Sequence, residues 1–299
     1  RLQDILLELV KGNEKGRWLT VAQNILGKEL SAKEILRETI SLYANNVVPF
    51  LFLYLSVAII IGLLNVVSFS VIGFRSIALL QSANEISASI QTQIIILVAF
   101  LILFSVINNF VYSIRDGASV LLTSNCLISS SCNFRSTISF VLPKATPLFV
   151  TELLVSTIAN LVTFLVFRGI VISLTTATFI ALIVSFSLAL VVIAVAVMLL
   201  LTIPTIVLEN KSFFASLSRS KTLASYNFSK AFFIWLASWS VSLLAGFVSG
   251  TLLLPFDERV VAVLSQVVLS IISPIFTISI TLLYYSMLFK EKTFRQVKS

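Results

Sequence analysis

The run ATFIALIVSFSLALVVIAVAVMLLLTIPTIVL, residues 177–208, decides the fold because it contains no charged residue. A helix needs roughly 20 mostly apolar residues to cross the hydrocarbon core of a bilayer, which is about 30 Å thick. This run is longer than that, so it predicts a transmembrane helix that tilts or kinks. The run ends at Glu209 and Asn210, where the chain turns polar.

Composition extends this prediction to the whole chain. Hydrophobic residues make up 58% of the 299 residues, charged residues 11%, and the mean hydropathy is +1.05. An ordinary soluble domain carries about 25% charged residues, so most of this chain is not built to face water. We expect an all-α integral membrane protein. Its six transmembrane helices are predicted at 47–73, 94–114, 146–167, 177–208, 231–256 and 260–288.

The basic residues give this arrangement an orientation. Of the 21 lysines and arginines, all but Arg75, Arg168 and Arg259 fall on one side of the predicted membrane. Positive charge concentrates in cytoplasmic loops, so both termini are predicted to be cytoplasmic, in the cell membrane. The net charge of +8 then comes from basic residues that flank the spans, where anionic lipid headgroups attract them. No basic patch with interleaved aromatics is evident, so nucleic acid is not an expected partner.

Three parts of the chain follow from this topology. Residues 1–45 are expected to form cytoplasmic amphipathic interfacial helices, 46–288 the six-helix transmembrane domain, and 289–299 a short basic tail. Ser31 and Glu34 have capping-box spacing and predict the start of a helix that leads into the first span. The interfacial helices either anchor the bundle on the membrane surface or form a docking platform for a partner protein.

Two connecting segments are harder to assign. Residues 74–92 are too polar to span and are expected to form a short external surface helix. Residues 116–145 are serine-rich and favour a surface helix or a shallow re-entrant segment. Cys126 and Cys132 lie there, on the predicted cytoplasmic side, where thiols are normally reduced, so we expect them to be unpaired. A disulfide remains the alternative for a hyperthermophilic source.

Glu152 is the only acid well inside a predicted span, and ionisable groups inside a bilayer are costly and often functional. In one interpretation Glu152 is structural, and it is either paired with another group or protonated between helices. The other makes it the coupling or gating group of a transporter or channel, facing a cavity with Asn108 and Asn109. The remaining polar residues predicted for the bundle core are Tyr112, in the second span, and Asn160, in the third.

Catalysis has little support in the sequence. The chain has no histidine, which is the commonest general acid–base near neutral pH and a frequent zinc ligand. We find no nucleophile elbow, zinc-protease motif, P-loop or dinucleotide fingerprint. We therefore predict no enzyme, no metal site and no cofactor. A lipid-directed enzyme would have to use the one interfacial polar cluster, Glu209 with Arg219 and Lys221.

That cluster belongs to the segment after residue 208, "ENKSFFASLSRSKTL" (209–223). Pro204 is expected to bend the end of the long span, because proline frees a backbone carbonyl. Glu209 and Asn210 mark the exit into the cytoplasm, and Asn210 or Ser212 is expected to cap an interfacial helix at about 211–229. On that helix one face is expected to carry Phe213, Phe214, Leu217, Ala224 and Phe228. Arg219 lies roughly opposite, and Lys221 snorkels to headgroups from the apolar side.

Three stretches resemble a known family. They are "ILRETISLYANNVVPFL" (35–51), the segment with Pro204, Glu209, Leu217, Arg219, Ser220 and Leu223, and Pro274 with "TLLYY" (281–285). In this order they are similar to the six-helix membrane domain attached to some bacterial glycerophosphodiester phosphodiesterases. Lys221 stands where that family usually has tryptophan, and Ser286 and Leu288 where it has an aspartate and an arginine. The catalytic barrel has no counterpart here, so the resemblance implies the membrane architecture and not the activity.

These observations favour a non-enzymatic multi-pass protein, a structural or accessory subunit that interacts with lipid. The expected partners are the bilayer with its anionic headgroups and either another membrane protein or a second copy of the chain. The alternative function is a transporter or channel that uses Glu152 and the polar patch at Asn108 and Asn109.

Overall fold

A computed structural model describes residues 28–81, 88–128, 134–176, 179–252 and 256–298. These ranges contain helices and no strand, which confirms the all-α fold. The predicted interfacial helices before residue 28 lie outside the described residues. The helices are α3 (Ala32–Asn45), α4 (Val47–Gln81), α5 (Ala88–Ile128), α6 (Phe134–Val141), the short 3₁₀ helix η1 (Leu142–Lys144), α7 (Ala145–Thr176), α8 (Phe179–Leu199), α9 (Thr202–Glu209), α10 (Phe213–Ser225), α11 (Phe228–Leu252) and α12 (Glu258–Lys298).

Six helical segments of the described chain are long and apolar enough to cross a membrane, so the multi-pass membrane class is confirmed. They correspond one to one to the six predicted spans. The segments are Val47–Ser68, Val98–Ile128, Phe134–Leu165, Ile183–Glu209, Phe228–Val248 and Val263–Glu291. The last helix continues to Lys298, so the predicted tail at 289–299 is largely its C-terminal end.

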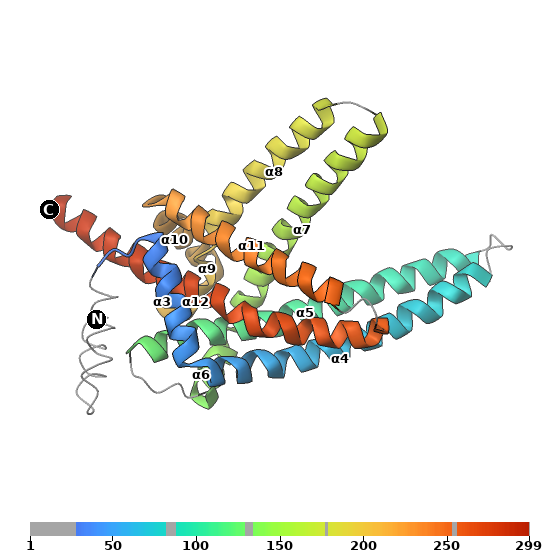
Figure 1. Ribbon diagram of the computed structural model, residues 1–299, viewed down its shortest axis with the longest axis horizontal. Coiled ribbons are helices and arrows are strands. Elements are labelled where there is room, and N and C mark those ends of the chain that lie inside the picture. Colours follow the sequence, from blue (N-terminus) through green and yellow to red (C-terminus); the bar gives the residue numbers. More distant parts are fainter. Residues whose placement is uncertain (1–27, 82–87, 129–133, 177–178, 253–255, 299) are drawn as a thin grey trace.

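The helices form a core with two projecting arms (Figure 1). One arm is the α4–α5 pair and the other is the α7–α8 pair, and the two arms diverge. Helix α12 is the shared element: α3, α4, α5, α10 and α11 all pack against it. Helices α3, α9 and α10 gather where the arms meet. We call that part of the molecule the closed end.

Residues 277–287 of α12 are all buried and form the centre of the closed end. Small polar residues and two tyrosines make up much of this segment, and they bond to neighbouring helices. The Tyr54 hydroxyl on α4 lies 2.9 Å from the Thr277 hydroxyl, and the Tyr285 hydroxyl lies 2.7 Å from that of Ser124 on α5. Such residues allow close helix approach and interhelical hydrogen bonds within a bilayer.

The predicted start of α3 is confirmed in detail. Ser31 is the N-cap, its hydroxyl accepts a hydrogen bond from the Glu34 N–H, and Glu34 Oε2 accepts one from the Ser31 N–H at 2.8 Å. The buried residues of α3, including Ile35 and Thr39, face the bundle. The Thr39 and Ser279 hydroxyls lie 3.1 Å apart, which joins α3 to α12.

The predictions for 74–92 and for the first part of 116–145 were wrong, whereas the short helices α6 and η1 occupy 134–144. Residues 74–81 continue α4 and residues 88–92 begin α5, so no separate surface helix occupies the described part of 74–92. Residues 116–128 are the continuous C-terminal third of α5, largely buried in the closed end. Their serines and threonines misled the hydropathy argument because they find partners on neighbouring helices instead of water. Gly117 shows how close the packing is, since a Cβ there would lie 2.7 Å from Leu148 Cδ1.

The prediction of unpaired cysteines was also wrong, because Cys126 is disulfide-bonded. The only other cysteine of the chain, Cys132, lies outside the described residues. Cys126 is buried at the end of α5 beside the core of the closed end.

Candidate functional site

Two groups of charged residues in the described chain involve the residues singled out by the sequence. The first joins α9, α10 and α12 around Arg219, and we call it the Arg219 clamp. The second, Asp116 and Glu152, lines an apolar cavity among α5, α7, α8, α9, α11 and α12. We call this cavity the Glu152 cavity. The clamp includes residues of the opening run's polar end, and the cavity includes the predicted intramembrane acid.

A break in the long fourth span positions the clamp. Helix α8 ends at Leu199 and α9 begins at Thr202, with buried Pro204 in the first turn of α9, where a missing N–H costs no helical bond. Ser220 of α10 fits into this break. Its hydroxyl donates to the Met198 carbonyl at 2.7 Å and accepts from the Leu201 N–H at 3.0 Å. The bend expected at Pro204 is therefore a true interruption, and α10 supplies its hydrogen bonds.

Asn210 and Ser212 lie in the turn between α9 and α10 and have different roles there. Asn210 has a left-handed backbone, with φ 53° and ψ 42°, and ends α9. Asparagine tolerates this conformation better than most residues. Ser212 occupies the N-cap position of α10 without a side-chain hydrogen bond to the helix. Asn210 therefore ends one helix and does not cap the next.

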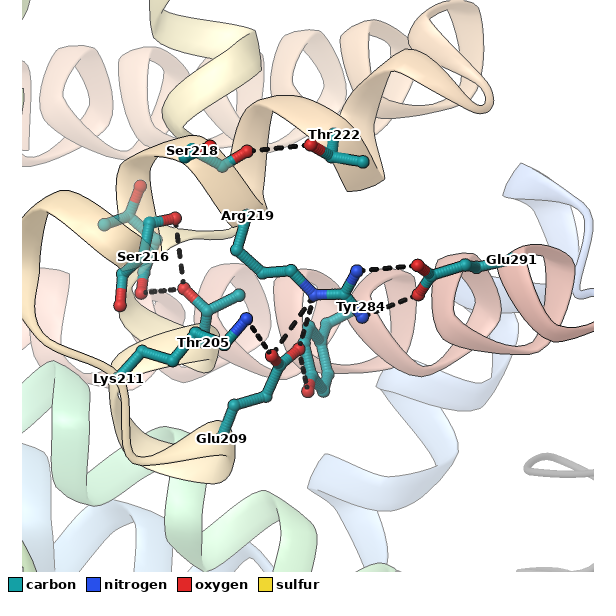
Figure 2. Close-up of polar contacts among 10 residues, drawn as sticks. Thr205, Glu209, Lys211, Ser216, Ser218, Arg219, Thr222, Tyr284 and Glu291 are labelled. Carbon is teal, nitrogen blue, oxygen red and sulfur yellow. Dashed lines mark hydrogen bonds and ion pairs between the residues drawn. The ribbon is translucent and has the colours of Figure 1, made fainter. Parts of the chain in front are cut away.

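Arg219 lies between two carboxylates (Figure 2). Its Nε donates to both oxygens of Glu209, at 3.0 and 3.2 Å. Its two terminal nitrogens form a fork on Glu291, at 2.8 and 2.6 Å. Because a bidentate arginine–carboxylate pair is among the strongest side-chain interactions, this arrangement fixes α10 to both α9 and α12.

Two further donors complete the clamp. The Tyr284 hydroxyl donates to Glu209 Oε1 at 3.0 Å, and Lys211 Nζ lies 3.0 Å from Glu209 Oε2. The formal charges of the two acids and the two basic residues cancel. Hydrogen bonds from Arg219 to Glu291, and then to Glu209, raise the pKa of the guanidinium, so it stays charged. Each charge in the clamp has a partner within it.

Helix α10 turns a mostly small and polar side toward the bundle. Its buried residues are Ser216, Ser220, Leu223 and Ala224. Phe214, placed on the predicted apolar face, is 79% exposed. Arg219 turns inward to the clamp, whereas Lys221 is exposed. Phe214 and Arg219 therefore lie on different sides of α10, and the carboxylates on α9 and α12 hold the Arg219 side against the bundle.

The Glu152 cavity has a volume of about 190 Å³. Glu152 on α7 and Asp116 on α5 give it an acidic end. Most of the other lining side chains are aliphatic or aromatic, among them Trp235 and Trp239 on α11. Asp116 was not expected here, because the second span was predicted to end at 114. Glu152 is therefore not the only acid inside the bundle.

Arg115 compensates one of the two acids. Its Nε lies 2.7 Å from Asp116 Oδ1. Its guanidinium carbon lies 4.9 Å from the ring centre of Tyr54 and 4.6 Å from that of Tyr112, distances typical of cation–π contacts. The Arg115 side chain is only 17% exposed, so this basic residue, assigned to a cytoplasmic loop by the sequence, lies within the bundle.

The other predicted core residues lie apart from the cavity. Asn109 donates to the Ser105 carbonyl at 2.8 Å on its own helix, and the Asn108 side-chain oxygen is buried without a hydrogen bond. The Tyr112 hydroxyl donates to Gln266 Oε1 at 3.2 Å. Asn160 is exposed on α7. The cavity predicted from Glu152, Asn108 and Asn109 is lined by Glu152 and Asp116 instead.

Several important residues were missed, although the sequence held a signal for some. Glu291 and Tyr284 are seven residues apart on α12, so both can face α9 and α10. Asp116 lies four residues after Tyr112, on the same face of α5, so the polar patch of the second span extends to it. Asp116 and Glu291 were missed because hydropathy alone placed the ends of these spans before them.

In the described residues, no group of three or more metal-ligating side chains is placed to hold a metal ion. No protein family, curated protein or solved structure matches this chain. The resemblance to the membrane domain of glycerophosphodiester phosphodiesterases stays a prediction.

Proposed function

We propose that this chain is a non-enzymatic accessory or structural subunit of a membrane assembly in the cell membrane, and that it interacts with lipid. The Arg219 clamp carries this proposal. Its carboxylates, guanidinium and amine bond to one another, so the polar cluster that a lipid-directed enzyme would have to use has its groups engaged in holding helices together. A general acid or base needs a group that can exchange a proton with a substrate.

The closed end is the side that we propose to face the cytoplasm. Basic residues from separate parts of the chain meet there: Glu29 accepts from Lys230 at 2.6 Å and from Lys290 at 3.3 Å. Exposed Lys221 lies on α10 of the same end. Basic side chains at a membrane surface attract anionic headgroups, and about 1 kcal/mol is typical for each one close to the surface.

Extraction in a mild detergent from the native membrane, followed by native mass spectrometry, tests the accessory role. We expect the chain to carry a protein partner or a second copy, together with lipid. A chain that always runs alone and free of lipid would contradict the proposal.

Cysteine labelling tests the orientation separately. Ser225, at the closed end, and Thr251, at the far end of α11, are both exposed. With a membrane-impermeant maleimide on intact cells, Thr251→Cys should label, and Ser225→Cys should label only after lysis. The reverse pattern would place the termini outside the cell.

A transporter or channel is the second candidate, and the Glu152 cavity is the observation that favours it. A carboxylate facing a cavity is a usual feature of coupled transport. Reconstituted protein should then show a solute flux that Glu152→Gln abolishes while Asn160→Ala retains it. Equal flux through the wild type and Glu152→Gln would remove Glu152 from any transport mechanism.

A further inference from the structure

The Glu152 cavity combines an acidic end with an apolar wall, a combination that selects a particular kind of ligand. Asp116 and Glu152 supply the acidic end, and Val155, Val162 and Leu199 are among the aliphatic side chains of the wall. Trp235 and Trp239 add two indole rings, which stack on each other with ring centres 5.9 Å apart. The cavity therefore offers one charged position and a larger apolar surface.

The charges at the acidic end do not cancel. Asp116 forms an ion pair with Arg115. Glu152 is close enough to both residues to interact with them electrostatically, but it receives no hydrogen bond and forms no ion pair within the described part of the chain. When both carboxylates are ionised, the single arginine leaves one negative charge without compensation. A ligand with a single positive charge would make the group neutral, and an uncompensated charge in a bilayer is costly.

The lining of the cavity is a poor match for a calcium ion. Calcium takes six to eight oxygen ligands, but beyond the two carboxylates the only lining hydroxyls belong to Thr151 and Thr163. Both hydroxyls donate to carbonyls of their own helix, at 2.8 and 3.0 Å. The remaining lining side chains are apolar and suit the hydrocarbon part of a ligand. The faces of tryptophan rings also attract organic cations.

The size and the opening of the cavity define the ligand further. An apolar cavity of about 150 Å³ in another protein holds benzene, so about 190 Å³ has room for a ring or a short chain with an ammonium group. Val155 and Trp239 line the cavity and are 38% and 44% exposed. They lie in helical segments that are able to span a membrane, so the cavity opens toward the surface that lipid would cover.

We infer that the Glu152 cavity binds an amphipathic organic cation, a primary or quaternary amine with an apolar group. Glu152 contacts the ammonium, Arg115 holds Asp116, and the two tryptophans and aliphatic residues cover the apolar group. The site goes beyond the accessory role and does not require transport. An amphipathic amine enters from the lipid phase with its apolar part leading toward the wall.

Tryptophan fluorescence provides a direct test, because two of the three tryptophans line the cavity. Trp18→Phe removes the third, and the full chain in a non-ionic detergent is titrated with benzylammonium, benzyl alcohol or benzoate. These probes share a ring and differ in charge. We expect a saturable change with benzylammonium, and affinity at least about 10-fold weaker for the other two, since a hydrogen bond to a charged group is worth that much or more.

Two variants separate charge from volume. Glu152→Gln should weaken benzylammonium binding at least about 10-fold and bring it near that of benzyl alcohol. Ala196→Leu keeps every charge but fills part of the cavity, and should weaken both probes; it also decides the matter if Glu152→Gln does not fold. Asn160→Ala, on the exposed side of the same helix as Glu152, should bind like the parent.

Three results would overturn the inference. They are a response that does not saturate, benzyl alcohol binding as tightly as benzylammonium, and unchanged affinity in a folded Glu152→Gln protein. The second result would mean that the cavity takes neutral apolar molecules. None of the three bears on the accessory role, which depends on co-purification.

Discussion

The closed end and the α7–α8 arm differ in a way that reverses the usual rule for soluble proteins. Within Val263–Glu291, which includes the centre of the closed end, 56% of the residues in an 18-residue apolar stretch are buried. Within Ile183–Glu209, the more apolar of the two, the corresponding share is 11%. In water the most apolar helix would be expected inside. In a bilayer the most apolar helix meets lipid, and helices associate through small and polar residues.

The same contrast explains where the polar groups lie. The closed end holds the Arg219 clamp, the Tyr54 hydroxyl bonds and the Ser220 bridge. Most of the described side chains of α8 between residues 180 and 191 are exposed, and Leu190 and Val191 are more than 60% exposed. We therefore expect substitutions at the closed end to change stability strongly, and similar changes on α8 to have little effect.

Removing Arg219 should have the largest effect. Arg219→Met leaves Glu209 and the 4% exposed Glu291 without their shared cation, and breaking a buried pair in this way costs about 3–5 kcal/mol. Arg219→Lys should restore little, because one ammonium cannot reproduce the fork. Thermal unfolding of the detergent-solubilised protein, followed by circular dichroism, measures both.

Lys221→Met is the matched control for Arg219, since the two basic residues lie on the same helix and Lys221 is exposed. Its effect should stay within about 0.5 kcal/mol, as for most surface substitutions. If Lys221→Met destabilises as much as Arg219→Met, the clamp does not hold the closed end together.

Gly117→Ala should have the next largest effect. The added Cβ would lie 2.7 Å from Leu148 Cδ1 and 3.0 Å from Val141 Cγ1, and overpacking of this kind costs about 1–3 kcal/mol. Gly246→Ala in α11 meets no atom within 4 Å, so the gain in helix propensity, up to about 1 kcal/mol, is unopposed. A loss of stability in both variants would point to a shared backbone effect instead of packing.

The sequence predicted the membrane spans well because hydropathy over 20 residues measures suitability for lipid directly. It placed all six helices and the cap of α3 at Ser31. It failed for polar stretches, because a polar residue in a helix either faces water or bonds to a neighbouring helix. The serine-rich last third of α5 was assigned to the surface, because hydrogen bonds such as that between Ser124 and Tyr285 join residues 161 positions apart.

The candidate site shows the same limit. Glu152, Glu209 and Arg219 were identified because charges next to or within apolar runs are conspicuous. Their acidic neighbours Asp116 and Glu291 were not, since both lay beyond the predicted ends of their spans. A pattern within one helix gives the face of a residue, but which face of a second helix meets it depends on the packing of the whole bundle.

Ser220→Ala tests whether a single hydroxyl holds the break between α8 and α9. It leaves the Leu201 N–H and the Met198 carbonyl without their shared partner, which costs about 1–3 kcal/mol for a buried unsatisfied group. Ser218→Ala, exposed on the same helix, should be nearly neutral. Hydrogen exchange should be faster at Leu201 in Ser220→Ala, and unchanged exchange there would show that the break is held by other contacts.

The smallest effect is expected at the exposed cap of α3. The backbone N–H of Ser31, and then Lys28 and the Ser31 side chain, lower the pKa of Glu34 from its usual 4.5 to about 2. A carboxyl with a lowered pKa in the folded state contributes stability that is fully present above pH 4.5 and is lost as the pH falls toward 2. Glu34→Gln keeps an acceptor for the capping box and removes only the charge.

The difference in unfolding midpoint between the wild type and Glu34→Gln should therefore be constant from pH 7 to 5 and shrink between pH 4.5 and 2. Lys28→Met should reduce the difference at neutral pH, because Lys28 Nζ lies 3.0 Å from Glu34 Oε1. A difference that persists unchanged at pH 2 would mean that the charge contributes nothing through this pKa. The effect is small because the carboxylate is in water, whereas the same charge on Glu291 is enclosed by the bundle, so the comparison measures what burial adds to a charged hydrogen bond.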